Sequence, residues 1–130
     1  MDYHLKTIPH KSQRYPTCGD YWMTANGLEL RVSDMGDLTQ ELAAAIHELI
    51  EQHLCKLAGI KIADIDSFDK NYETSREDKI PLPCGCKIQE EPGNDIHAPY
   101  HLQHVFATVL EKQFIGEAAW AAYDKKINDL

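Results

Sequence analysis

The stretch from residue 38 to residue 58 restricts the fold most, because its apolar residues recur at helical spacing. One stripe of the helical wheel carries Leu42, Ile46, Leu49, Ile50, His53 and Leu57. Asp37, with Gln40 three residues later, has the spacing of a capping box, and Gly59 stands where helices commonly end. We predict a helix from about 38 to 58 whose stripe faces the core, with His53 as a hydrogen-bonded core residue.

The residues before this helix favour strands. Leu28, Leu30 and Val32 alternate with polar residues, as in a strand with one buried face. They follow Asn26-Gly27, a dipeptide that favours the type I′ turn of a hairpin. Residues 2–8 also alternate and predict a short strand, whereas 10–19 read as a polar loop.

The second half of the chain is less regular. Asp64 is expected to cap a short helix, and the charges and prolines of 74–94 predict a long surface loop. Pro99 suits the first residue of a helix that runs to about Phe114, and a last amphipathic stretch carries Trp120, Tyr123 and Ile127. We predict a single α+β domain over 1–130, in which a small antiparallel sheet packs against two or three helices.

Charge and composition exclude several classes of function. The chain has 130 residues, 43% of them hydrophobic, which suits one domain with a core. Its net charge of −8 repels phosphate backbones, so we expect no nucleic-acid partner, whereas a basic protein surface or peptide would fit. No apolar run approaches the ~20 residues of a membrane span, and the N-terminus lacks the features of a signal peptide. We therefore expect a cytoplasmic protein with no membrane partner.

The main chemical signal is His47-Glu48-Leu49-Ile50-Glu51, within the predicted helix. Positions i and i+4 of a helix share one face, so His47 and Glu51 can point at the same spot. Taken alone, such a pair is most often an ordinary ion pair at the surface.

A second cluster strengthens the functional interpretation. His97, His101 and His104 stand around the start of the next predicted helix, and Glu111 follows two turns later. Imidazole nitrogens and one carboxylate can hold a divalent ion and leave a position for water.

The two clusters together predict a site for one divalent metal ion. The expected ligands are His47, Glu51, His101 and His104. Glu48 is then the candidate base, while Glu111 would be a second carboxylate or would orient a ligand histidine.

The five-residue motif resembles the His-Glu-x-x-His signature of zincin metallopeptidases, with Glu51 at the second histidine position. In the smallest zincins a hairpin similarly precedes the motif helix, and a later helix supplies the third ligand. The resemblance covers about residues 20–57 and 98–115. It implies that His47 is a ligand, Glu48 a general base, and His104 or His101 the third ligand. Zinc is the expected ion, and the two-His, one-carboxylate set also suits iron or manganese. The chain also resembles short uncharacterised proteins of bacteriophage and prophage genomes, which implies no activity.

The cysteines give a weaker signal. Cys84-Gly85-Cys86 is one residue tighter than the common zinc hairpin, and it would bind metal with Cys18 only if the fold brought them together. Cys55 is expected to be a small core residue. Three hypotheses remain open: a metal-dependent hydrolase, a structural metal site that ties two helices together, and an acidic interaction module without metal.

Overall fold

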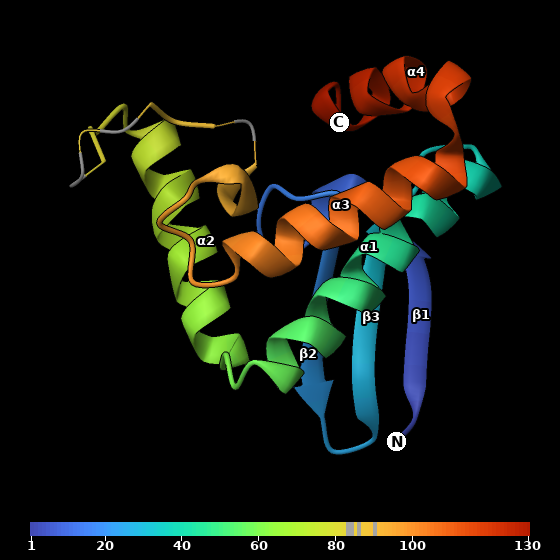
Figure 1. Cartoon of the computed structure of the whole chain (residues 1–130), viewed down its shortest axis with the longest axis horizontal. Coiled ribbons are helices and arrows are strands. Elements are labelled where there is room, and N and C mark those ends of the chain that lie inside the picture. Colours follow the sequence, from blue (N-terminus) through green and yellow to red (C-terminus); the bar gives the residue numbers. More distant parts are fainter. Residues whose placement is uncertain (83–84, 86, 90) are drawn as a thin grey trace.

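The computed structural model places a three-stranded sheet behind helix α1, and α3 crosses over α1 (Figure 1). It describes residues 1–82, 85, 87–89 and 91–130. In chain order the elements are β1 (Tyr3–Ile8), β2 (Gly19–Thr24), β3 (Gly27–Ser33), α1 (Leu38–Leu57), α2 (Ile62–Glu77), α3 (His101–Ile115) and α4 (Glu117–Asn128). The predicted α+β class is confirmed.

The sheet has the order β1-β3-β2 and is mixed. The predicted hairpin is confirmed, since β2 pairs with β3 in antiparallel register, with Tyr21 opposite Leu30. However, β1 runs parallel to β3, so the expectation of a wholly antiparallel sheet is wrong. The loop between β1 and β2 carries the chain to the far edge of the sheet, and the hairpin then returns to the middle.

The hairpin turn lies one residue earlier than predicted. Its tip is Ala25-Asn26, and Gly27, with a φ of 129°, is already the first residue of β3. A Cβ atom at Gly27 would lie 2.2 Å from the carbonyl oxygen of Asp2, which accepts a hydrogen bond from the N–H of Leu28. The glycine is therefore needed for the close approach of β1 as well as for its positive φ.

Helix α1 begins and ends as predicted, but it buries a different face. The Asp37 side chain accepts the N–H of Gln40, as the capping box requires. Leu49 is 40% exposed and Leu57 72% exposed, and His53 is exposed too, so the predictions of a buried stripe and of a core histidine are wrong. The buried residues of α1 are Ala43, Ala44, Ala45, His47, Glu51, Gln52 and Cys55. Small side chains allow α1 to pack closely on its neighbours, and its polar pair faces inward.

The later helices differ from prediction mainly at their ends. Helix α2 is longer than expected, and Asp64 lies in its first turn, whereas Lys61 is the N-cap residue. Helix α3 begins two residues after Pro99 and ends one residue after Phe114. The predicted Cys84 and Cys86 pair lies outside the described residues.

Two groups of buried apolar side chains hold the elements together. One joins the hairpin to α1, α2 and the start of α3, and comprises Tyr21, Leu28, Leu30, Cys55, Ile65, Ala98 and Tyr100. The other joins β3 and α1 to α4, and comprises Val32, Met35, Ala43, Ala44, Ala45 and Tyr123. None of the helices in the described part of the chain combines the length and apolar character of a membrane span.

Candidate metal centre

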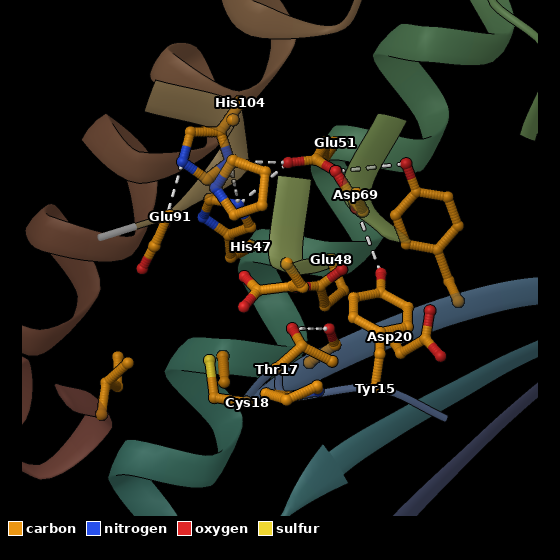
Figure 2. A pocket seen from close by; sticks show the side chains of 18 of the residues that line it. Tyr15, Thr17, Cys18, Asp20, His47, Glu48, Glu51, Asp69, Glu91 and His104 are labelled. Carbon is orange, nitrogen blue, oxygen red and sulfur yellow. Dashed lines mark hydrogen bonds and ion pairs between the residues drawn. The ribbon is translucent and has the colours of Figure 1, made fainter. Parts of the chain in front are cut away.

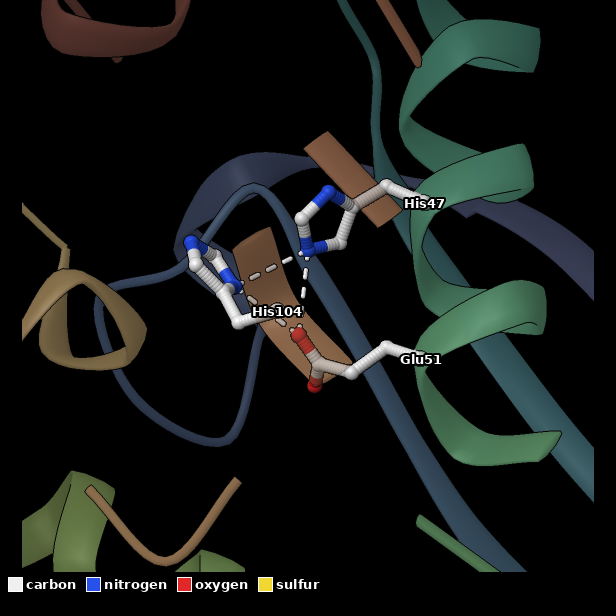
Figure 3. A group of neighbouring side chains, drawn as sticks. All are labelled: His47, Glu51 and His104. Carbon is white, nitrogen blue, oxygen red and sulfur yellow. Dashed lines mark hydrogen bonds and ion pairs between the residues drawn. The ribbon is translucent and has the colours of Figure 1, made fainter. Parts of the chain in front are cut away.

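Three polar atoms from two helices converge on one point between α1 and α3 (Figure 3). His47 Nε2 lies 3.1 Å from Glu51 Oε2 and 3.1 Å from His104 Nδ1. His104 Nδ1 lies 2.9 Å from the same Glu51 oxygen. The i, i+4 spacing on α1 brings His47 and Glu51 together, and the packing of α3 across α1 supplies His104.

The outward ring nitrogen of each histidine lies close to a further carboxylate. His47 Nδ1 lies 3.1 Å from Glu111 Oε1, and His104 Nε2 lies 3.0 Å from Glu91 Oε2. A carboxylate at one ring nitrogen holds the proton there and leaves the lone pair of the other nitrogen available. With a metal ion bound, both histidines could therefore turn a lone pair toward it, whereas without one they donate protons to the carboxylate of Glu51.

The Glu51 carboxylate is oriented in a similar way. The hydroxyl of Tyr21, on β2, donates to Glu51 Oε1 at 3.1 Å, and the other oxygen is left facing the histidines. Tyr21 is 4% exposed and Glu51 is 5% exposed, so this hydrogen bond is shielded from water. Sheet and helices together thus fix all three converging atoms.

The dimensions of the cluster fit a metal ion. Ligand atoms bound tetrahedrally to one zinc ion at about 2.0–2.1 Å lie about 3.3–3.4 Å apart. The three separations of 2.9–3.1 Å are close to this, so a small outward movement of each side chain would admit the ion. Within the described residues no fourth His, Cys, Asp or Glu joins the group.

Without a metal ion, protons must balance the buried charge. Burial disfavours the Glu51 carboxylate, but the hydrogen bonds from His104 and His47 outweigh it and hold its pKa at about 2. Burial likewise opposes protonation of His104, but Glu51 and Glu91 raise its pKa to about 9. The pKa of His47 is also raised, because Glu111 and Glu51 outweigh the effect of burial. A metal ion binding here would displace these protons.

Glu48 lies beside this cluster in a pocket of about 210 Å³ (Figure 2). Among the described residues, no hydrogen bond or ion pair engages its carboxylate, although His47, Glu51 and Asp20 are close enough to influence it. Burial, followed by the charge of Glu51, raises the pKa of Glu48 well above its usual value. Thr17 and Cys18, from the loop before β2, line the pocket beside it.

Two glycines allow the backbone to lie against these side chains. A Cβ atom at Gly19 would lie 2.5 Å from Glu48 Oε1, and one at Gly93 would lie 2.4 Å from the Cγ of His104. Gly93 also accepts a hydrogen bond from His101 Nδ1 at 2.8 Å. The turn at 92–94 therefore holds the start of α3 and packs against the ring of His104.

The structure brings together some of the predicted residues but not all. His47, Glu51 and His104 converge, and Glu111 is the outer partner of His47. The prediction that His101 is a ligand is not supported, since its Nδ1 is engaged by a backbone carbonyl and it lies outside the cluster. His97 instead lies beside Asp95, with its Nδ1 3.0 Å from Asp95 Oδ1.

Sequence reasoning missed three functional partners: Glu91, Tyr21 and Tyr123. Glu91 stands in the irregular segment before α3, where no periodicity shows which way a side chain points. The strand pattern places Tyr21 among buried residues, but it does not reveal the partner of its hydroxyl. Tyr123 was recognised only as part of an apolar stretch.

Searches against protein-family models, curated proteins and solved structures found no match. The cluster must therefore be interpreted from its own chemistry.

Proposed function

We propose that His47, Glu51 and His104 bind one divalent metal ion, preferentially zinc, and that the site hydrolyses a peptide-like substrate. The observation that carries the metal site is the set of three buried acceptor atoms within 3.1 Å of one another, each on a side chain whose other polar atom has a partner. Iron and manganese also accept two histidines and one carboxylate, so the bound metal must be identified experimentally.

A set of three candidate ligands among the described residues supports catalysis over a purely structural role. Structural zinc sites usually have four protein ligands, whereas catalytic sites keep one position for water or substrate. A bound ion supplies Lewis acidity, which lowers the pKa of water at that position.

Glu48 is the candidate general base. Its carboxylate lies in the pocket, next to the ligands, with no hydrogen bond from a described residue to occupy it. A general base must be within hydrogen-bonding reach of the proton that it takes, and the position of Glu48 in the same pocket as the three candidate ligands supports this role. The same group can then deliver the proton to the leaving amine.

The charge of the pocket favours a cationic substrate. Its described lining carries these carboxylates: Asp20, Glu48, Glu51, Asp66, Asp69, Glu73, Glu91 and Glu111. Arg14 pairs with Asp20 and Asp66, and Glu73 lies 3.7 Å from Arg76, so the arginines offset part of this charge. Protonation of Glu48 and Asp69, whose pKa values are raised by burial, reduces the negative charge further, and the carboxylates that stay ionised would attract a basic peptide.

Metal analysis of untagged protein purified without chelator tests the first half of the proposal. We expect about one equivalent of zinc, iron or manganese in the wild type, and none in a His47→Ala, Glu51→Ala double variant. His53→Ala is the matched control, because His53 is an exposed histidine on the same helix. Absence of metal from the wild type, with no binding of added zinc, manganese or iron, would contradict the proposal.

Glu48→Gln tests the second half, since it keeps the shape of the side chain but removes the base. The variant should bind metal like the wild type and lose at least ~100-fold in kcat on a peptide substrate. Glu117→Gln, an exposed position on α4, should leave kcat unchanged. A metal-loaded protein on which Glu48→Gln has no effect would exclude Glu48 as the base while preserving the metal site.

A further inference from the structure

A continuous series of hydrogen bonds connects the last helix, α4, with the cluster of His47, Glu51 and His104. Tyr123, on α4, donates its hydroxyl proton to Glu111 Oε2. The other oxygen of Glu111, on α3, lies 3.1 Å from His47 Nδ1, on α1. His47 Nε2 in turn faces Glu51 and His104.

Every member of this series is shielded from solvent. Tyr123 is 0% exposed, and Glu111 and His47 are each 6% exposed. The Tyr123 ring packs in the apolar group formed by β3 and α1, and Trp120, from the same helix, lies against it at 5.4 Å between ring centroids. Hydrogen bonds in such surroundings are stronger than in water, and the rigid ring fixes where the hydroxyl lies.

The donors and acceptors in this series of hydrogen bonds show that each residue orients the next one. The phenol can donate to Glu111 Oε2, so the carboxylate is held with Oε1 toward the histidine. Oε1 then accepts the Nδ1 proton of His47, which keeps the Nε2 lone pair turned toward the cluster. Without the phenol, the Glu111 carboxylate would be free to rotate, and the orientation of the ligand would be less well fixed.

We propose that Tyr123 is a positioning residue for the metal ligand His47, acting through Glu111, and that α4 thereby contributes to metal affinity. This inference rests on the proposed metal site, and it concerns the affinity of that site rather than its reaction. The competing interpretation is that Tyr123 only satisfies a buried carboxylate and stabilises the fold.

Zinc affinity of Tyr123→Phe, measured by competition with a chromogenic chelator, separates the two interpretations. The variant keeps the ring, and we expect its dissociation constant to rise about 10- to 100-fold, the usual effect of losing an outer partner of a ligand. Tyr72→Phe is the matched control. Tyr72 is also buried, at 2% exposure, and its hydroxyl accepts a hydrogen bond from the Gln89 N–H outside the pocket. The control should change the dissociation constant less than twofold.

The His47 Nδ1 proton provides a readout that general destabilisation would not move. In zinc-loaded wild type its NMR signal should be protected from exchange with water by Glu111. In Tyr123→Phe it should exchange faster, while the Nε2 proton of His104 is unchanged. If Tyr123→Phe does not fold, Glu111→Gln replaces it, and it should raise the dissociation constant by a similar factor.

The outcomes distinguish this inference from the proposal on which it rests. A wild type that binds no zinc overturns both. A wild type that binds zinc, with Tyr123→Phe within twofold of Tyr72→Phe and an unchanged Nδ1 signal, overturns the positioning role alone.

Discussion

His47 Nε2 lies 3.1 Å from His104 Nδ1, although the two histidines are 57 positions apart in the chain. Their rings meet edge to face, with centroids 4.6 Å apart. Each ring has a carboxylate at its outer nitrogen, so two inner ring nitrogens and a Glu51 oxygen meet in a buried space. Such an arrangement needs a cation between the acceptors, which is either a proton or a metal ion.

Replacing His104 tests which histidine of α3 matters. His104→Ala should abolish zinc binding, because it removes one of three ligands, whereas His101→Ala should retain it. The two residues lie one turn apart on the same helix, and only His104 reaches the cluster. Calorimetric titration with zinc is the measurement. Added zinc at 100 times the dissociation constant should raise the free energy of unfolding by about 2.7 kcal/mol in wild type and His101→Ala only. Loss of binding in both variants would show that His101 is also needed for zinc binding.

Asp69 should make stability depend on pH. Burial raises its pKa from 3.8 to about 7, against the opposing hydrogen bond from Tyr100, and Glu51, Tyr15 and Asp66 also face it. The folded protein therefore binds this proton more tightly than the unfolded chain does. The free energy of unfolding should accordingly fall as the pH rises from about 4 to about 7. Asp69→Asn should remove the contribution of Asp69 to this slope. Above pH 7 its free energy of unfolding, relative to that at pH 4, should exceed that of the wild type by about 1.4 kcal/mol for each unit by which the Asp69 pKa differs between the folded and unfolded states. Urea unfolding at a series of pH values would show it, and identical slopes in both proteins would refute it.

The sequence predicts where the helices and strands lie better than it predicts which face of each is buried. Helix α1, the hairpin and the shared face of His47 and Glu51 follow from local spacing, which is a property of the backbone, whereas His104 joins them only through the packing of α3 on α1. The buried face of α1 does not follow, because the leucines of its most apolar stripe are exposed while alanines and the polar pair are buried. Burial depends on which neighbours approach, and close packing on the sheet and on α3 selects small residues. Glu91 was missed for a related reason, since only the tertiary structure carries this loop side chain to His104.

Two substitutions to alanine test which side chains the structure buries, one on the exposed stripe of α1 and one in the core. Leu57 is 72% exposed, so Leu57→Ala should change the free energy of unfolding by no more than about 0.5 kcal/mol. Leu28 is 0% exposed on β3, and Leu28→Ala should cost about 2–5 kcal/mol. Chemical denaturation of both variants gives the comparison. A large loss from Leu57→Ala would mean that the apolar stripe of α1 is covered in solution.

Substrate charge should affect the rate if the pocket potential acts on binding. We expect peptides carrying lysine or arginine to be cleaved with a higher kcat/KM than their glutamate counterparts, with the difference shrinking as salt screens the charges. Asp66, on α2, lines the pocket and pairs with Arg14. Asp66→Asn removes this negative charge, so it should reduce the ratio of kcat/KM between basic and acidic peptides. Equal kcat/KM for both peptide series at low salt would contradict the prediction that the charge of the pocket favours basic substrates.

The two close-packed glycines allow metal binding and catalysis to be separated without touching a ligand or the base. Neither has a positive φ, so alanine would be tolerated by the backbone at both positions, and only the new methyl group matters. At Gly93 the methyl group would press on the ring of His104, so Gly93→Ala should displace a ligand and weaken zinc binding at least ~10-fold. At Gly19 it would press on the carboxylate end of Glu48, so Gly19→Ala should bind zinc normally but hydrolyse peptides slowly. Parallel zinc titrations and peptide assays would check both. Weakened metal binding in Gly19→Ala would contradict this division of roles, because it would mean that the position of Glu48 helps to hold the ion rather than only to serve the reaction beside it.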